Sequence, residues 1–173
     1  MCASHFFAVE TALRAPAERV WQHASTFAGV NRELWPVAQM TYPRTTARLV
    51  PGAVPLGRRA FRSWVLLFGL VPVDFDDFTL IELSPGRGFQ EVSPLLSMWE
   101  WRHRRTITPA AWGCVVRDEV SCVPRWRWAA PFLVAVYHTA FRLRHRALQR
   151  YFGRAGVVRT VLQSDSALAG LQQ

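Results

Sequence analysis

A long amphipathic segment near the C-terminus places the strongest constraint on the fold of this chain. Plotted at about 100° per residue, residues 131–152 carry most of their large apolar side chains on one face. These side chains are Leu133, Val134, Tyr137, Ala140, Phe141, Leu148, Tyr151 and Phe152. Gly153 then ends the helical pattern. A helix with such a face must cover an apolar surface, and the chain before it supplies strands.

The segments near the N-terminus predict one strand and two short helices. Alternate apolar residues predict a strand within residues 5–15. The Ala-Pro pair at residues 15–16 opens a helix, because proline at the first helical position gives up no hydrogen bond that the helix needs. Gly29 breaks this helix, and a second helical turn runs to Leu34. The Trp-Pro pair at residues 35–36 then makes the chain extended.

From residue 59 onward, apolar runs alternate with turns rich in glycine and proline. Five strands are expected, at residues 59–68, 73–83, 89–93, 98–107 and 114–123. Connections this short favour antiparallel pairing between neighbours in the sequence. The sequence therefore predicts an α+β fold, in which a curved antiparallel sheet of about six to seven strands grips the C-terminal helix and a cavity lies between them.

The length of the chain fits a single domain. We expect residues 1–153 to form this domain and residues 154–173 to be a loosely attached tail. The cysteines Cys2, Cys114 and Cys122 have no metal-type spacing. Reduced thiols and the lack of a signal peptide predict a cytoplasmic protein. The longest apolar run suits a buried or interfacial helix rather than a membrane span, which leaves peripheral membrane contact possible.

The charge of the chain is carried by arginine alone and is unevenly placed. All 21 basic residues are arginine, and the formal net charge is +9. Seven of these arginines lie in residues 125–154, which contain no acidic residue. Codon usage in a GC-rich genome explains the absence of lysine. The clustering instead suits a patch that binds phosphate, anionic lipid or nucleic acid through the guanidinium fork, so both explanations stay open.

Four stretches of sequence, taken in order, resemble those of a known superfamily. They are APAERVW at residues 15–21, WRHRR at 101–105, VRDEV at 116–120 and FRLRHRAL at 141–148. Together they are similar to the helix-grip superfamily of START and Bet v 1-like proteins (SRPBCC), and within it to the bacterial polyketide cyclase/dehydrase and lipid-transport group. The resemblance implies this fold and a cavity for a hydrophobic ligand. Because the superfamily includes carriers, aromatase/cyclases and coenzyme Q-binding proteins, no activity transfers with it.

Arg144 is the residue that fits its surroundings least well, since it lies near the centre of the apolar stripe of the last helix. Burying a lone cation costs on the order of several kcal/mol. Three interpretations are open for Arg144. It forms an ion pair with Asp118 or Glu91, it snorkels to water, or it binds a ligand carboxylate.

Trp101 and His103 lie on one face of a strand, in the same alternation as Arg105 and Ile107. If that face is concave, the indole and the imidazole line the cavity, and His103 can exchange a proton near neutral pH. If it is convex, they form a surface patch. His103 also suits a packing role, held by a hydrogen bond to Asp118 or Glu119.

Two further groups of residues each have a functional and a structural interpretation. Asp74, Asp76 and Asp77 could bind a cation or act as acid and base, or they could form a solvated strand edge that blocks aggregation. Trp126 and Trp128 alternate with arginines. They suit contact with a membrane or a single-stranded nucleic acid, or a lid that folds over the mouth of the cavity.

The favoured function is the binding of a small hydrophobic or lipid-like molecule between sheet and helix. Arg144 and His103 are expected to orient the ligand. The apolar lining is expected to come from Trp64, Phe75, Trp101, Tyr137 and Phe141. One alternative is a cyclase or dehydratase that moves protons with His103 and either Asp118 or Glu91. Another is a basic module, residues 125–154, that binds an anionic membrane, a protein or, less favoured, RNA. The sequence contains no motif that requires a metal or an organic cofactor.

Overall fold

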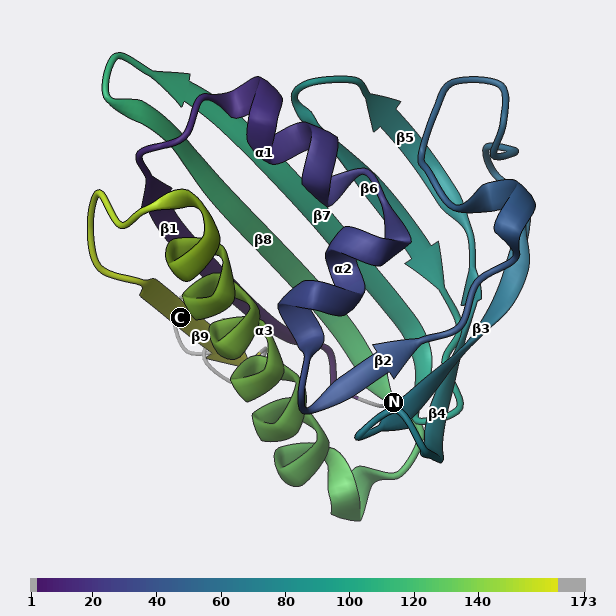
Figure 1. The fold of residues 1–173 in the computed structure, drawn as a ribbon. Coiled ribbons are helices and arrows are strands. Elements are labelled where there is room, and N and C mark those ends of the chain that lie inside the picture. The colour runs from purple at the N-terminus through teal and green to yellow at the C-terminus, as the bar shows by residue number, and fades with distance from the viewer. Residues whose placement is uncertain (1–2, 165–173) are drawn as a thin grey trace, which may run out of the picture.

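The computed structural model of the chain describes residues 3–164, and its largest element is a six-stranded antiparallel sheet (Figure 1). The strand order is β5-β6-β7-β8-β1-β9. The strands are β1 (His5–Leu13), β5 (Leu80–Ser84), β6 (Gly88–Ser93), β7 (Met98–Ala110), β8 (Gly113–Pro124) and β9 (Arg159–Ser164). The long helix α3 (Ala130–Phe152) lies across one face of this sheet (Figure 1). The predicted α+β helix-grip arrangement is confirmed.

A second, three-stranded sheet stands beside the first, with the order β2-β3-β4. Its strands are β2 (Ala38–Met40), β3 (Phe61–Leu67) and β4 (Val71–Phe78). The sequence predicted one strand at residues 73–83, but the chain passes from the small sheet to the large one at Thr79. The amide of Thr79 donates to Ser93 Oγ at 3.2 Å, and its carbonyl accepts from the amide of Val92 at 3.0 Å. The single meander expected from the sequence is therefore two sheets, because an apolar alternation does not reveal which partner each half of it pairs with.

Two short helices are present as predicted, but the break between them lies at residues 25–26 rather than at Gly29, which is inside the second helix. Both cover the same face of the large sheet as α3 (Figure 1). They are α1 (Ala17–Ala24) and α2 (Phe27–Leu34). Thr26 caps α2, since its hydroxyl accepts from the amide of Gly29 and donates to the carbonyl of His23, both at 2.9 Å. The chain leaves α2 in extended conformation at Trp35, as expected from the proline that follows. Two single-turn 3₁₀ helices, η1 (Arg44–Thr46) and η2 (Arg127–Ala129), complete the helical segments of the described residues.

The predicted bounds of α3 are confirmed, and Val134, Phe141 and Leu148 of its predicted inner face are buried, whereas Tyr151 of that face is 53% exposed. Gly153 follows its last residue with φ of 79°, a conformation that glycine adopts without steric cost. The buried residues of α3 are Ala130, Val134, Phe141, Arg144, His145 and Leu148. Residues 125–154 do not form one basic face, because Arg144 points inward whereas Arg142, Arg146 and Arg150 are exposed.

The core of the described residues consists of three apolar clusters, and a charged layer lies between two of them. The first cluster includes Phe7, Val9, Trp101, Val120 and Phe141. The second includes Leu13, Val20, Ile107, Val116 and Leu148. On β7, β8 and α3 alike, the residues between the two clusters are polar. They are His103 and Arg105, Asp118, and Arg144 and His145.

Residues 159–164, which the sequence analysis assigned to a tail, form the edge strand β9. It pairs antiparallel with β1, from Glu10 opposite Arg159 to His5 opposite Ser164. β2 and β9 are the strands that the sequence did not predict. Residues 165–173 lie outside the described part of the chain.

The thiols of Cys114 and Cys122 are both free and buried. Burial raises the pKa of Cys122 to about 12 and also raises that of Cys114. Cys2 lies outside the described residues. Between residues 3 and 164, no helix is both long and apolar enough to cross a membrane.

Candidate functional site: a buried charged cluster beside a small pocket

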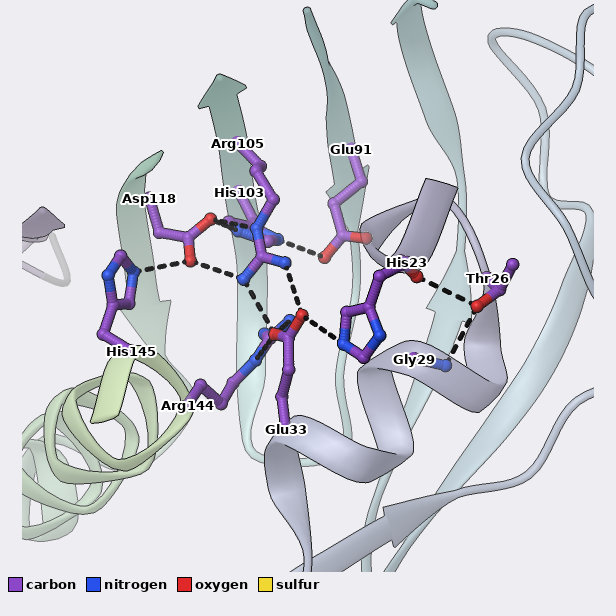
Figure 2. Close-up of polar contacts among 10 residues, drawn as sticks. All are labelled: His23, Thr26, Gly29, Glu33, Glu91, His103, Arg105, Asp118, Arg144 and His145. Carbon is purple, nitrogen blue, oxygen red and sulfur yellow. Dashed lines mark hydrogen bonds and ion pairs between the residues drawn. The ribbon is translucent and has the colours of Figure 1, made fainter. Parts of the chain in front are cut away.

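Arg105 of β7 is the centre of a buried cluster of charged side chains (Figure 2). Its guanidinium donates to Asp118 of β8 from Nε at 2.8 Å and from Nη2 at 2.7 Å. It also donates to Glu33 of α2 from Nη1 and Nη2, each at 3.0 Å. All three side chains are fully buried. One arginine therefore ties α2 to the large sheet through charge-assisted hydrogen bonds to two carboxylates.

Arg144 of α3 also pairs with Glu33. Its Nε and Nη2 atoms lie 3.1 and 3.0 Å from Glu33 Oε2. The Arg144 side chain is only 8% exposed, so the interpretation that it snorkels to water is wrong. The interpretation as a buried ion pair is correct, but the partner is Glu33 rather than Asp118 or Glu91. Glu33 thereby joins α2, α3 and β7.

Asp118 is held from two further sides by histidines. His103 Nε2 lies 2.9 Å from Asp118 Oδ1, so the predicted hydrogen bond between them is present. His145 Nε2 lies 2.9 Å from Asp118 Oδ2. The other ring nitrogen of His103, Nδ1, lies 3.7 Å from Glu91 Oε1. His103 is thus placed between two carboxylates.

The arginines of the cluster keep its two central carboxylates, Glu33 and Asp118, ionised. Burial alone would raise the pKa of Glu33, but the nearby guanidinium groups of Arg105 and Arg144 outweigh it and lower this pKa well below its usual range. Burial is likewise outweighed by Arg105 at Asp118, whose pKa is lowered. Burial alone would lower the pKa of His103. The hydrogen bonds and charges of Asp118 and Glu91 raise it by more, so the net shift of this pKa is upward. Two arginines and two carboxylates therefore balance one another.

A pocket of about 60 Å³ opens beside this cluster, beneath α2 and between the two sheets. Its apolar walls include Phe27, Val30, Met40, Leu49, Phe78 and Phe89. Its polar groups include Asp76, Glu91, His103 and Arg144. Pockets that enclose a drug-sized ligand hold about 300–1,000 Å³, so this conformation has room for only a few water-sized groups. The cavity expected directly under α3 lies instead under α2, because aromatic side chains fill the contact between α3 and the sheet.

Asp76 is the polar group of the pocket whose hydrogen bonding is least complete. It is 5% exposed, and its Oδ1 atom has no hydrogen-bond partner among the described residues. Burial, followed by the charge of Glu91, raises the pKa of Asp76 well above its usual value. A protonated Asp76 can both donate and accept a hydrogen bond.

The other two aspartates of β4 have partners of their own. Asp74 accepts hydrogen bonds from the hydroxyls of Ser97 and Tyr137. Asp77 pairs with Arg62 at 2.8 Å. The interpretation of the three aspartates as a solvated edge is therefore wrong for Asp74 and Asp76, which are both buried.

The structure brings some of the predicted site residues together and separates others. The face of β7 that carries Trp101 and His103 is the inner one, which settles the direction that the sequence left open. His103, Glu91 and Arg144 line the pocket. Asp118 lies behind His103, on the side away from Glu91.

The predicted apolar lining residues lie away from the pocket. Trp101, Tyr137 and Phe141 pack in the first apolar cluster, and Trp101 Nε1 donates to Glu91 Oε1 at 3.1 Å. Trp64 and Phe75 stack edge to face in the small sheet with ring centres 5.6 Å apart. Trp64 is 42% exposed. None of these residues is among those that line the pocket.

Glu33 and His145 belong to the site but were missed by the sequence analysis. Glu33 belongs to a short helix with an unremarkable pattern, although it follows Gly29 by four residues and so shares its face. Asp76 was noted only as one of three neighbouring acids. Within residues 3–164, no group of three or more His, Cys, Asp or Glu side chains could hold a metal ion.

The fold is similar to several solved structures at low sequence identity. A START superfamily protein from Mycobacterium smegmatis matches with a TM-score of 0.62 and 11% identity, over 86% of this chain and 97% of that one. Ara h 8.0201 matches with a TM-score of 0.56 and 8% identity, over 85% and 99%. DynU16, from the dynemicin biosynthetic locus, matches with a TM-score of 0.54 and 18% identity, over 86% and 49%.

These likenesses show the fold alone, and they confirm that the chain has the helix-grip fold of the START and Bet v 1-like superfamily. Residues 11–152 match the family described as domain of unknown function DUF8410, and the chain belongs to that family. A search of curated proteins gave no match.

Proposed function

We propose that this protein binds a small hydrophobic or lipid-like molecule in the pocket beneath α2. The observation that carries the proposal is the pocket itself, where apolar walls enclose a few converging polar groups. A ligand larger than the pocket volume of about 60 Å³ would have to displace Met40 and Leu49, which form part of the pocket wall. Both residues lie outside the large sheet, so moving their side chains leaves the hydrogen bonds of that sheet intact, while their own backbone stays bonded to Asn31 and to Ser25.

The charge balance of the site indicates which polar group the ligand carries. Arg144 is paired with Glu33, and His103 lies between Asp118 and Glu91, so neither of these pocket groups is left over for a ligand carboxylate. Asp76 instead offers an unused oxygen. We therefore expect a neutral hydrogen-bonding group, such as a hydroxyl, at the polar end of the ligand.

Binding can be tested with a long-chain alcohol and the carboxylic acid of the same length, by native mass spectrometry and calorimetry. The alcohol is expected to bind more tightly. Val30→Phe fills the pocket and should weaken this binding about tenfold, because roughly two fewer methylene groups are buried at about 0.8 kcal/mol each. Val136→Phe, the same change on the exposed face of α3, is the control. Equal binding by both variants, or no retained molecule at all, contradicts the proposal.

A second candidate is a cyclase or dehydratase, and the position of His103 in the pocket favours it. Both nitrogens of the imidazole face carboxylates, and its pKa is raised mainly by Asp118 against the effect of burial. The ring is therefore suited to donate a proton rather than to accept one. His103→Gln is expected to abolish turnover of a polyketide-like substrate while sparing its binding. Unchanged turnover excludes this role.

A further inference from the structure

One end of the molecule gathers exposed apolar side chains from four separate segments. These segments are residues 35–37 after α2, the β3–β4 turn at residues 68–73, the loop at residues 96–99, and η2 with the first turn of α3 at residues 126–132. We call this surface the apolar end. Its most prominent side chains are Trp35, Phe68, Leu70, Trp99, Trp128 and Phe132. In Figure 1 the start of α3 and the β3–β4 turn both lie toward the bottom of the view.

Contacts made by these segments, or by residues next to them in the chain, connect the four segments to one another. The amide of Phe68 donates to the carbonyl of Val37 at 2.9 Å, and the amide of Leu96 donates to Phe75 of β4 at 3.2 Å. The guanidinium of Arg125 lies 4.0 Å from the centre of the Trp99 ring, and its Nε donates to the carbonyl of Leu95. The apolar end is therefore one connected surface.

The exposure of these side chains is too large to reflect ordinary surface composition. Trp128 is 85% exposed, Leu70 82% and Phe132 70%. Trp128 is therefore not folded down over a cavity, and neither Trp128 nor Trp126 is among the residues that line the pocket. Single exposed apolar residues are common, but a cluster drawn from several loops marks an interaction surface. Phe68 is also held at a φ of 52°, a costly conformation for a bulky residue, which keeps its ring at the turn.

The charge around the apolar end indicates what it contacts. The four segments of the apolar end, residues 35–37, 68–73, 96–99 and 126–132, contain no acidic residue, and Arg125 directly precedes the last of them. Arg125 packs on Trp99 and bonds a carbonyl rather than a carboxylate, so its positive charge is kept at the surface. Tryptophan and arginine beside exposed aliphatic side chains are typical of proteins that lie in the headgroup region of a bilayer. A symmetric pairing with a second copy would instead bring the arginines of the two copies together.

We propose that the apolar end docks on an anionic lipid bilayer. Trp128, Phe132 and Leu70 would enter the boundary between headgroups and acyl chains, while Arg125 meets anionic headgroups. This surface extends well beyond the arginine-rich segment, since two of its four parts come from the α2–β2 connection and the β3–β4 turn. The proposal does not depend on what the pocket beneath α2 binds.

Co-sedimentation of the full chain with vesicles tests this proposal. Vesicles of phosphatidylcholine mixed with phosphatidylglycerol are expected to bind the protein, and rising salt should weaken but not abolish the binding. Phe132→Ser and Trp128→Ser should each lower the partition coefficient about tenfold, because each removes one large apolar side chain from the contact. Both residues are exposed, so the variants should fold, which circular dichroism can verify.

The matched control is Trp112→Ser. Trp112 is 51% exposed and lies in the turn between β7 and β8, outside the four segments, so vesicle binding should be unchanged. Equal loss in the control, or no vesicle binding by the wild-type chain, overturns the proposal. So does a dimer in size-exclusion chromatography that Trp128→Ser abolishes while vesicles bind nothing, because the surface would then be an interface between copies.

Discussion

At the scale of single residues, the charged cluster explains why Arg144 can lie in an apolar stripe. Its charge is matched by Glu33, which Arg105 also holds. The sequence revealed that Arg144 needed a partner and that His103 and Arg105 share a face. It could not reveal the partner, because Glu33 lies 111 residues from Arg144 and only the packing of α2 on the sheet brings them together.

Removing the Glu33 carboxylate should strongly destabilise the fold. Glu33→Gln leaves Arg105 and Arg144 buried with one carboxylate fewer, and breaking a buried ion pair on one side costs about 3–5 kcal/mol. Urea unfolding followed by circular dichroism measures this loss. The control is Glu119→Gln, since Glu119 forms a partly exposed pair with Arg117 worth about 0–1 kcal/mol. Similar losses in the two variants would contradict the central role of Glu33.

Asp76 should make the protein less stable as the pH rises. Its folded pKa is raised, by burial and then by Glu91, above the unfolded value near 4. Between these two pKa values the folded chain keeps a proton that the unfolded chain has lost. The free energy of unfolding therefore falls by about 1.4 kcal/mol per pH unit in that window, and the stabilising contribution is complete only below it.

Asp76→Asn cannot titrate, so it should flatten this pH dependence in urea unfolding measured from acidic to neutral pH. Asp77→Asn is the matched control. The pKa of Asp77 is lowered by its hydrogen bond with Arg62, so its stabilising contribution is lost at acidic pH instead. An unchanged slope in Asp76→Asn would show that the carboxyl is ionised in the folded protein.

At the scale of elements, the position of α2 decides whether the charged cluster can form. The cap at Thr26 begins the helix, and Gly29 lets it approach the end of α1 closely. The sequence predicted that α1, α2 and α3 exist, because apolar spacing and helix-start signals are local, although it placed the break between α1 and α2 at Gly29, which lies within α2. It did not predict the division into two sheets at Thr79, because strand partners are set by contacts between distant segments.

Gly29→Ala should destabilise the protein, although the same change within a helix normally stabilises by about 0.5–1 kcal/mol. A Cβ atom at Gly29 would lie 2.0 Å from the carbonyl oxygen of His23, which is backbone and cannot turn aside. Displacing α2 would also draw Glu33 away from Arg105. We expect a loss of about 1–3 kcal/mol in chemical denaturation. Gly156→Ala, whose nearest contact is Ala12 Cβ at 3.3 Å, should change stability little.

At the scale of the whole molecule, β9 protects an edge of the large sheet. It covers the backbone of β1 from His5 to Glu10. A chain that ends at residue 158 would leave those amides and carbonyls unpaired, and unpaired edges associate. Analytical ultracentrifugation should show concentration-dependent association of this shortened chain. A chain that ends at residue 164 keeps β9 and serves as the control, so equal behaviour of the two would contradict the protective role.

Arg105 of β7 stands directly opposite Asp118 of β8. If these strands slipped by two residues, the same side chains would still face the core, because side chains alternate with a period of two. The burial of apolar side chains therefore favours the native register only weakly over the slipped one. Such a slip would place Arg105 opposite Val116 or Val120. The charges of Arg105 and Asp118 would then be buried in the apolar core without their partners. The ionic layer therefore favours the observed register over the slipped ones, because only the observed register places Arg105 opposite Asp118.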